Sequence, residues 1–344
     1  MEISPTTREN LALLDKTLEK CRTVLIVIHD YPDPDALAAA TAFSHLMHSR
    51  YKIRTKIAYG GLITRAENRA MVQQLQLKIS PASEIRWKRY RCVALLDTQP
   101  KFTNHALPQQ IRPTVVIDHH LARQPIAADF ADIRTGYGAC ATMLLEYLLA
   151  AEVDIPVNVA TAIAYAIRTE TQDFGRDTAH VDIQAYLQVY PKANKRKLAK
   201  ITNPKLPHQY FLILNTTLAK ARAFRHVAHV HLGEVESPEF ISQIADLLLR
   251  HARISWALAT GRYKDYLFIS IRASHPNANA ARALSRTLRH LGTGGGHASM
   301  AGGRIHFPDQ QESAWQQLEQ TVINRFMKSL GLKANSAWKM LLEK

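Results

Sequence analysis

The sequence is organised around one stretch, His29-Asp30-Tyr31-Pro32-Asp33-Pro34-Asp35-Ala36. It follows the apolar run 24–28, which predicts a short buried strand, and precedes an Ala-rich run that predicts a helix. In an open α/β sheet, ligands bind where the carboxyl ends of strands meet helix N-termini. The stretch therefore predicts either a polar turn in which Asp33 caps the helix, or half of a divalent-metal site that uses His29, Asp33 and Asp35.

The length and charge of the chain limit its organisation and its partners. At 344 residues it exceeds the size at which single cores usually stop growing, so we expect two domains. Lys and Arg number 44 against 29 Asp and Glu, which gives a net charge of +15. This surplus favours polyanionic partners such as nucleic acids, nucleotides or membrane surfaces, and a basic protein with no nucleic-acid role is the alternative.

The cysteines and the apolar runs indicate the compartment. Cys21, Cys92 and Cys140 are widely spaced in apolar contexts, so we interpret each as a small core residue and predict no disulfide framework. The N-terminus carries several charges and lacks a secretory apolar region. No apolar run approaches the roughly 18 residues that a bilayer span requires. We therefore predict a soluble, cytoplasmic protein.

Short apolar runs alternate with amphipathic segments through the first half of the chain. We expect helices at 6–20, 34–47, 65–75, 138–151 and 156–168, and strands at 24–28, 52–59, 92–96 and 114–117. This alternation is typical of an α/β fold with a mostly parallel sheet and helices on both faces.

A basic, proline-flanked segment divides the chain. We place a linker at 191–206, between a first domain at 1–190 and a smaller α/β domain at 207–344, although a solvated helix face explains its middle equally well. The second domain should contain strands at 226–232, 254–260 and 266–272 and helices at 208–223, 238–251, 279–291 and 312–330, with a short helix at 335–343. A glycine-rich stretch, 292–303, is expected to form a loop after the helix at 279–291.

Polar residues follow three of the predicted strands of the first domain. Asp97 follows one strand, Asp118-His119-His120 follows another, and the turn at 29–36 follows the first. Carboxyl ends of parallel strands share one sheet edge, so these carboxylates would repel one another unless cations neutralise them. As a set they predict a metal site rather than a series of helix caps.

These residues resemble the DHH phosphoesterase superfamily, which is named for the motif at Asp118-His119-His120. The partner domain of that family, DHHA1, carries a Gly-Gly-His signature that is similar to the stretch from Gly294 to Gly302. Both motif groups occur in the family's order, and the compact length looks most like the nanoRNase/pAp-phosphatase subgroup. The resemblance implies a DHH domain and a DHHA1 domain with the active-site cleft between them.

The resemblance also implies two divalent cations, most simply Mn²⁺, and a role for each motif residue. His29, Asp33 and Asp97 would hold one cation; Asp97 would bridge to the second, held also by Asp35, His119 and the acidic residue of the fourth motif. Asp118 would orient a ligand, and His120 would face the substrate phosphate. The fourth motif has Thr169-Glu170-Thr171 where the family has aspartate, so Glu170 is the expected ligand and Asp173 is its rival.

The second domain supplies the predicted substrate contacts. Glycines let backbone N–H groups approach a phosphate closely, so we expect Gly294, Gly295 and Gly296 to contact it, with His297 adding a hydrogen bond or charge. Arg272 resembles the family's phosphate-binding arginine, and its guanidinium suits bidentate recognition of phosphate.

The predicted activity is metal-dependent hydrolysis of short nucleotide substrates. The candidates are RNA dinucleotides and nano-oligonucleotides, linear dinucleotides, and 3′-phosphoadenosine 5′-phosphate (pAp). The alternatives are a cyclic-dinucleotide phosphodiesterase and, from a different class, a non-catalytic nucleotide-binding or sensor protein. We expect no long duplex nucleic acid and no membrane as partner, and the sequence leaves open whether the chain forms a homodimer.

Overall fold

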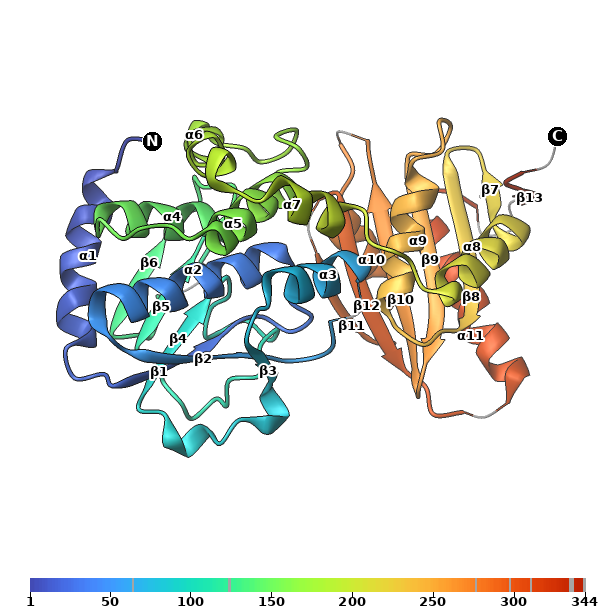
Figure 1. Ribbon diagram of the computed structural model, residues 1–344. Helices are drawn as coiled ribbons and strands as arrows, with labels where there is room; N and C mark the ends of the chain where they lie inside the picture. The colour runs from blue at the N-terminus through green and yellow to red at the C-terminus, as the bar shows by residue number, and fades with distance from the viewer. Residues whose placement is uncertain are drawn as a thin grey trace. The chain divides into compact units, whose positions relative to one another are not determined.

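The computed structural model describes residues 1–63, 65–122, 125–275, 277–296, 298–309, 311–333 and 337–342. The chain divides into two compact units, Met1–Lys205 and Leu206–Lys344, each built around its own sheet (Figure 1). Within the described ranges, no helix combines the length and the apolar character that crossing a membrane requires.

Unit 1 contains a fully parallel sheet of six strands in the order β3-β2-β1-β4-β5-β6. Its strands are β1 (Thr23–Val27), β2 (Arg54–Tyr59), β3 (Ile79–Pro81), β4 (Cys92–Leu96), β5 (Val115–Asp118) and β6 (Phe130–Ile133). The expected α/β fold with a parallel sheet is therefore confirmed, and β3 and β6 extend it at the two edges.

The strand order reverses between β1 and β4. From β1 the chain adds β2 and β3 on one side, and it then returns to add β4, β5 and β6 on the other. Such a reversal opens a crevice beyond the carboxyl ends of the two central strands, where ligands of open α/β sheets bind. The turn at 29–36 follows β1 and Asp97 follows β4, so both lie at this reversal.

The two faces of the unit 1 sheet are covered differently. The helices are α1 (Pro5–Leu18), α2 (Pro34–Tyr51), α3 (Ala66–Leu75), α4 (Cys140–Ala150), α5 (Val157–Glu170), α6 (His180–Val189) and α7 (Lys195–Thr202). Side chains alternate along a strand, so Val24 and Ile26 of β1 pack in one cluster with α1, α2, α4 and α5. Leu25 and Val27 face the other side and pack in a second cluster that includes Leu107. The short 3₁₀ helices η1 (Ala82–Glu84) and η2 (Trp87–Arg89) border this cluster, and Trp87 of η2 packs against it.

The segment predicted as a linker, 191–206, contains regular structure. It begins in the 3₁₀ helix η3 (Tyr190–Lys192) and continues into α7, which Asn194 caps by accepting a hydrogen bond from the Lys197 N–H at 3.0 Å. Leu198 and Ile201 are buried on one face of α7, and the helix packs against α3 and α5 in unit 1. Two inward residues among many lysines give too weak a periodic signal for sequence reasoning to favour a helix.

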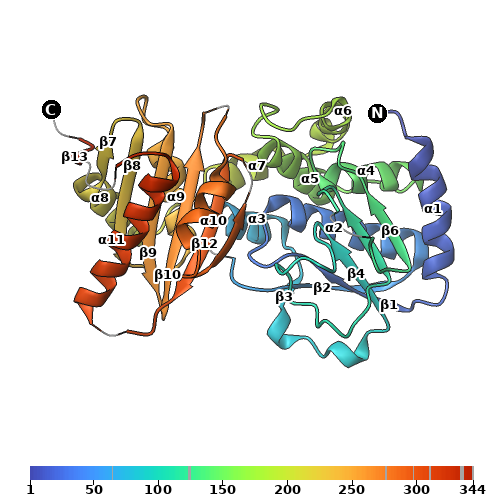
Figure 2. The same cartoon turned by 180° about the vertical axis from the view of Figure 1, so that it is seen from behind.

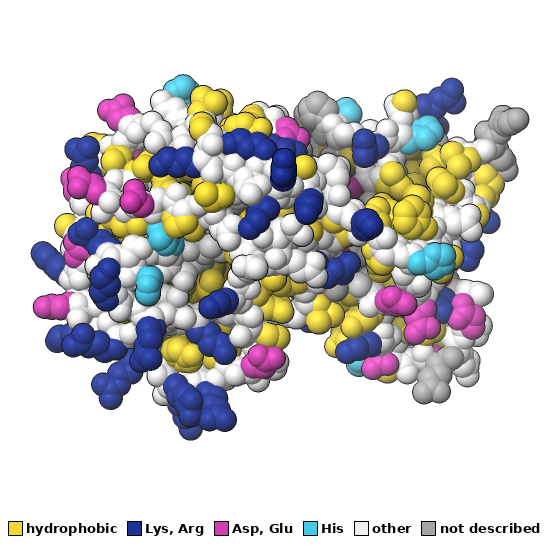
Figure 3. All heavy atoms as spheres, in the orientation of Figure 1, with side chains coloured by type: hydrophobic (Ala, Val, Ile, Leu, Met, Phe, Trp, Pro, Cys, Tyr) yellow, Lys and Arg dark blue, Asp and Glu magenta, His cyan; other side chains and the backbone are white. Residues whose placement is uncertain are grey.

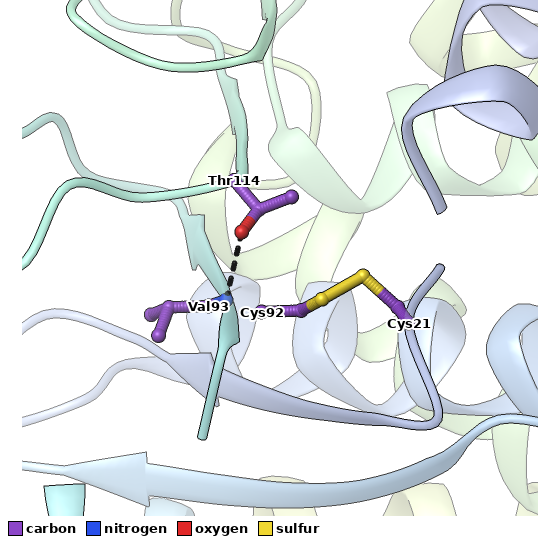
Figure 4. Close-up of a disulfide and its surroundings, with 4 residues drawn as sticks. All are labelled: Cys21, Cys92, Val93 and Thr114. Atoms are coloured by element: carbon purple, nitrogen blue, oxygen red, sulfur yellow. Dashed lines mark hydrogen bonds between the residues drawn. A yellow bond between two sulfur atoms is a disulfide. The ribbon is translucent and has the colours of Figure 1, made fainter. Parts of the chain in front are cut away.

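A disulfide joins Cys21 and Cys92, so the interpretation of these two cysteines as separate core thiols was wrong (Figure 4). Cys21 precedes β1 and Cys92 begins β4, and these strands are neighbours in the sheet, with Val24 opposite Cys92. The pairing of the strands therefore brings together two cysteines that lie 71 residues apart. Cys140 remains a free, buried thiol.

Unit 2 contains a mixed sheet of seven strands in the order β11-β12-β10-β9-β8-β7-β13. Its strands are β7 (Arg222–Phe224), β8 (Val227–Glu234), β9 (Trp256–Tyr263), β10 (Tyr266–Ala273), β11 (Thr293–Gly296), β12 (Met300–His306) and β13 (Lys339–Met340). Only the β8–β9 pair is parallel among these neighbours.

Helices cover both faces of the unit 2 sheet. They are α8 (His208–Lys220), α9 (Glu239–Leu249), α10 (Ala280–Leu288) and α11 (Glu312–Ser329). Figure 1 shows α8 and α9 in front of the sheet, and Figure 2 shows α11 on the opposite side. The short helix predicted at 335–343 was wrong, because its described part contains β13, which pairs with β7.

Candidate metal centre

The turn after β1 uses its polar residues for two purposes at once. Asp33 caps α2, because its Oδ1 accepts a hydrogen bond from the Ala36 N–H at 3.0 Å. Its other oxygen, Oδ2, lies 3.4 Å from Nε2 of His29. The helix cap and the metal ligand that the sequence offered as alternatives are therefore compatible, because each needs one carboxylate oxygen.

His29 and His119 are held in the same way. Nδ1–H of His29 donates to the carbonyl of Asp30 at 2.9 Å, and Nδ1–H of His119 donates to the carbonyl of Tyr137 at 3.0 Å. In the neutral ring, a backbone acceptor at Nδ1 leaves Nε2 without a proton, which is the form that binds a cation. Both rings thus direct Nε2 toward the carboxylates.

Asp97 lies between the two histidines. Its Oδ2 is 3.6 Å from Nε2 of His29, and its Oδ1 is 3.5 Å from Nε2 of His119. Asp97 is buried, and its Oδ1 has no hydrogen-bond partner among the described residues. A buried oxygen without a donor is costly, and a cation would satisfy it, so this residue fits the predicted bridge.

Asp35 is held by the N-terminus of α4. Its carboxylate accepts the Cys140 N–H at 2.7 Å and the Ala141 N–H at 2.8 Å, and its Oδ2 lies 3.7 Å from Nε2 of His119. The start of α4 is in turn held by Asp182 of α6, which is fully buried. Asp182 accepts hydrogen bonds from the Gly138 N–H at 2.8 Å and the Thr142 hydroxyl at 2.6 Å.

Asp118 and His120 form a pair beside this group. Nδ1–H of His120 donates to Oδ1 of Asp118 at 2.8 Å, and the side-chain amide of Gln99 donates to Oδ2 of Asp118 at 2.8 Å. Both oxygens of Asp118 are thus occupied by donors, so its carboxylate fixes the orientation of His120. Nδ1 of His120 also lies 3.7 Å from Oδ1 of Asp97.

Two groups of side chains bring their ligand atoms within 4.8 Å of one another: His29 with Asp33 and Asp97, and His119 with Asp97 and His120. The first is the set that the resemblance implied for one cation. The second shares Asp97 and His119 with the other implied set, but it contains His120, which we predicted to face substrate.

Glu170 and Asp173 differ in their surroundings. Glu170 ends α5, and burial together with the carboxylates of Asp33 and Asp35 raises its pKa to about 7. The Asp173 side chain is 74% exposed and pairs with Arg168 at 2.7 Å. Both acids pair with an arginine, Glu170 with Arg176 at 3.4 Å and Asp173 with Arg168. The charges of Asp33 and Asp35 act on the pKa of Glu170, which connects this acid to the cluster.

Two carboxylates of the cluster, Asp35 and Asp97, are crowded enough to oppose their own ionisation, whereas, despite burial, His29 holds the pKa of Asp33 below its usual range. Burial and the charge of Asp33 raise the pKa of Asp35 to about 7. Burial, with Asp35 and Asp33 close by, raises the pKa of Asp97 well above its usual range. Burial lowers the pKa of His29, but Asp33, the Asp30 carbonyl and Asp35 together outweigh it and raise that pKa to about 9. Bound cations would remove this repulsion, so the charges as well as the donor atoms fit a metal centre.

The predicted phosphate contacts lie in unit 2. Gly294, Gly295 and Gly296 belong to β11 and pair with β12, so the expectation of a loop at these glycines was wrong. A Cβ at Gly294 would lie 2.7 Å from the Gly302 carbonyl oxygen, which explains this glycine by close strand packing. His297 lies outside the described residues.

Arg272 of β10 is mostly buried and already has acceptors. Its Nε donates to Oδ1 of Asp246 at 2.5 Å, and its Nη1 donates to the Ser270 hydroxyl at 2.8 Å. Any phosphate at Arg272 would therefore share the guanidinium with these two residues.

Comparison with known proteins agrees with this geometry. Residues 23–167 match the N-terminal domain of the DHH family, and residues 225–324 match the DHHA1 domain. The chain belongs to the DHH family. The cluster from His29 to Glu170 lies in or next to the DHH match, whereas Arg272 and the three glycines lie in the DHHA1 match.

The relatives of this DHH protein extend over most of its length. An uncharacterized protein of Methanocaldococcus jannaschii is 30% identical over 330 residues, which cover 93% of this chain and 67% of the relative. An exopolyphosphatase-related protein from Bacteroides fragilis has the same fold, with a TM-score of 0.72 at 14% identity, over 94% of this chain and 98% of that chain. Exonuclease RecJ bound to manganese aligns with a TM-score of 0.52 at 14% identity, over 94% of this chain and 95% of that chain.

Sequence reasoning missed two residues that support the centre, Gln99 and Asp182. Gln99 follows Asp97 by two positions, but a lone glutamine after a strand is not distinctive. Asp182 lies outside every motif, and among the described residues its hydrogen bonds connect it to the centre through the start of α4. No local pattern could have identified either of them.

Replacing Glu170 with alanine should lower metal-dependent turnover by roughly a hundredfold or more, because it removes the carboxylate that we predict as a ligand and whose charge acts on Asp97. It should also weaken the binding of one of two Mn²⁺ ions, which isothermal titration calorimetry measures. Asp173→Ala is the matched control and should change neither quantity appreciably. If Asp173→Ala abolishes turnover while Glu170→Ala is mild, the ligand assignment is wrong.

Proposed function

We propose that this DHH protein is a divalent-metal-dependent phosphoesterase that hydrolyses short nucleotide substrates. The observation that carries the proposal is the position of Asp97, with one carboxylate oxygen toward His29 and the other toward His119. A single buried carboxylate between two histidines that each direct Nε2 toward it suits a pair of cations that share one ligand.

In this proposal His29, Asp33 and Asp97 hold one cation, and Asp35, Asp97, His119 and Glu170 hold the other. Two such cations supply Lewis-acid stabilisation of the phosphate oxygens and lower the pKa of a water molecule. Nitrogen and oxygen ligands together suit Mn²⁺, and manganese in the RecJ structure supports it as the first metal to test.

The chain's own residues orient the reaction. Asp118 accepts Nδ1–H of His120, so Nε2 of His120 is the atom available to the substrate phosphate or the departing oxygen. The attack of water on phosphorus forms one P–O bond and breaks the bond to the leaving nucleoside oxygen, which takes up a proton. No side chain has to become a covalent nucleophile.

The proposal includes nucleotides rather than longer nucleic acids as substrates, and it places the protein in the cytoplasm. On the face drawn in Figure 3, Lys and Arg side chains are spread over the surface rather than gathered in a single track. A net charge of +15 favours anionic substrates in general. It gives no support to a dedicated groove for a long strand.

Turnover of a series of substrates tests the proposal. Full-length protein with Mn²⁺ is assayed on 5′-labelled RNAs of increasing length, pAp, linear and cyclic dinucleotides, and inorganic polyphosphate. We expect kcat/KM to be highest for the shortest RNAs, linear dinucleotides or pAp, and to fall as RNA length increases.

The other outcomes separate the alternatives. Preference for an intact cyclic dinucleotide would favour the cyclic-dinucleotide phosphodiesterase. Preference for polyphosphate would exclude nucleotides as the substrate class. Tight binding of one of these compounds without hydrolysis would indicate a sensor.

A further inference from the structure

The turn that carries His29 and Asp33 also contains an aromatic residue in an unusual conformation. Tyr31 has a φ of 56°, in the left-handed region that bulky residues seldom adopt. Its N–H donates to the Gly60 carbonyl at 3.0 Å, which ties it to the end of the neighbouring β2. Such a conformation is strained and tends to occur at functional sites.

The ring of Tyr31 lies directly over Gly61. A Cβ built on Gly61 would lie 2.9 Å from each of three ring carbons, Cδ1, Cδ2 and Cε1, so one face of the ring rests on the glycine backbone. Gly61 itself has a φ of +68°. The Tyr31 ring is thus supported from one side by Gly61, yet the Tyr31 residue is 43% exposed.

The position of Tyr31 relates it to the predicted substrate phosphate. Tyr31 is two residues from both His29 and Asp33, so its Cα is at most about 7.6 Å from theirs. In a nucleotide, one ribose separates the base from the phosphate. This bound is on the backbone, and a tyrosine side chain attached this close to the cation ligands can reach the base whose phosphate reacts.

We propose that Tyr31 stacks on the nucleobase of the substrate and makes this centre selective for nucleotides over phosphate esters without a base. The inference rests on the proposed function and narrows its substrate class. A supported, partly exposed aromatic ring is how proteins recognise single bases without reading their sequence, because every base has a flat face. Inorganic polyphosphate offers no such face.

Equilibrium binding of two phosphate monoesters tests the proposal without requiring turnover. The probes are AMP and ribose 5-phosphate, which differ in the base, and they are titrated into full-length protein loaded with Mn²⁺. The variants are Tyr31→Phe, which keeps the ring, and Tyr31→Asn, which removes it while tolerating the left-handed backbone. Tyr190→Asn is the matched control, because Tyr190 is a 38% exposed tyrosine in η3.

We expect wild-type protein and Tyr31→Phe to bind AMP at least about tenfold more tightly than ribose 5-phosphate. Tyr31→Asn should lose about tenfold in AMP affinity, with ribose 5-phosphate and Mn²⁺ binding unchanged. Tyr190→Asn should match wild type throughout.

Three results would overturn the proposal: no preference for AMP in wild-type protein, equal loss of both probes in Tyr31→Asn, or a loss in Tyr31→Phe as large as in Tyr31→Asn. The proposed function fails by a different result, namely the absence of hydrolysis of every phosphate ester tested. A preference for AMP that depends on Tyr31 would then still support stacking.

Discussion

Asp97→Asn should abolish metal-dependent turnover, with a loss of roughly a thousandfold or more, because Asp97 is the carboxylate that both predicted cation sites share. The substitution keeps the shape of the side chain but replaces one anionic oxygen with an amide that donates hydrogen bonds. Calorimetric titration should therefore detect weakened binding of both Mn²⁺ ions. Loss of a single ion would mean that Asp97 does not bridge.

In the metal-free protein, the same substitution should raise the thermal stability. The pKa of Asp97 is raised by burial and by the carboxylates of Asp35 and Asp33. An acid with a raised pKa in the folded state destabilises that state when pH rises above its unfolded value, because ionisation then occurs against repulsion. At pH 7 the metal-free Asp97→Asn variant should therefore melt at a higher temperature than metal-free wild type, and Mn²⁺ should no longer raise its Tm.

A control in the same turn makes this result specific. Asp30→Asn changes the charge next to His29, but no hydrogen bond or ion pair joins the Asp30 carboxylate to the described ligand set. It should keep both Mn²⁺ ions and most of the turnover. Equal losses in Asp30→Asn and Asp97→Asn would indicate a general effect of charge rather than ligation.

Removing the disulfide between Cys21 and Cys92 should lower the free energy of unfolding by about 4 kcal/mol, because the bond closes a long loop and restricts the unfolded chain. Guanidinium unfolding of the Cys21→Ala/Cys92→Ala variant, followed by circular dichroism, measures this change. Turnover of the folded variant should be retained, because both cysteines lie at the start of their strands and the candidate centre lies beyond the strand ends.

Reduction provides the matched comparison. Dithiothreitol should shift the unfolding midpoint of the wild type toward that of the double variant, and it should leave the double variant unchanged. A wild-type midpoint that is insensitive to dithiothreitol, with free thiols at Cys21 and Cys92, would contradict the disulfide. Disulfides persist mainly in oxidising compartments. Thiol titration of protein from a reducing cytoplasm therefore also shows whether the disulfide forms in the proposed compartment.

Much of the candidate centre could be predicted because its residues follow local patterns. Apolar runs locate β1, β4 and β5, and the polar residues that follow each run are adjacent to it in sequence. Parallel strands place their carboxyl ends at one edge, so a correct strand assignment is enough to bring His29, Asp97 and His119 together. The tertiary distances between these residues agree with that expectation.

The glycine stretch shows where local patterns mislead. Consecutive glycines usually indicate a loop, but Gly294 and Gly296 pair with β12 at distances that a side chain would obstruct. The basic segment at 191–206 is the reverse case, because it was interpreted as a linker but contains the helix α7. Its many lysines obscure the periodic signal of Leu198 and Ile201, the two buried residues of that helix.

By itself, the sequence determined the parallel α/β class, the order of the two domains and the motifs of the candidate metal centre, because each depends on short-range periodicity or on residues next to a strand end. Only the tertiary structure decided the partners of those motifs. It joined Cys21 to Cys92 by a disulfide and Gln99 to Asp118 by a hydrogen bond. It also connected Asp182 through the start of α4 to Asp35 and placed the Tyr31 ring over Gly61. These contacts join segments that are distant along the chain, and the order of strands in the sheet, rather than the spacing of residues, determines which segments meet.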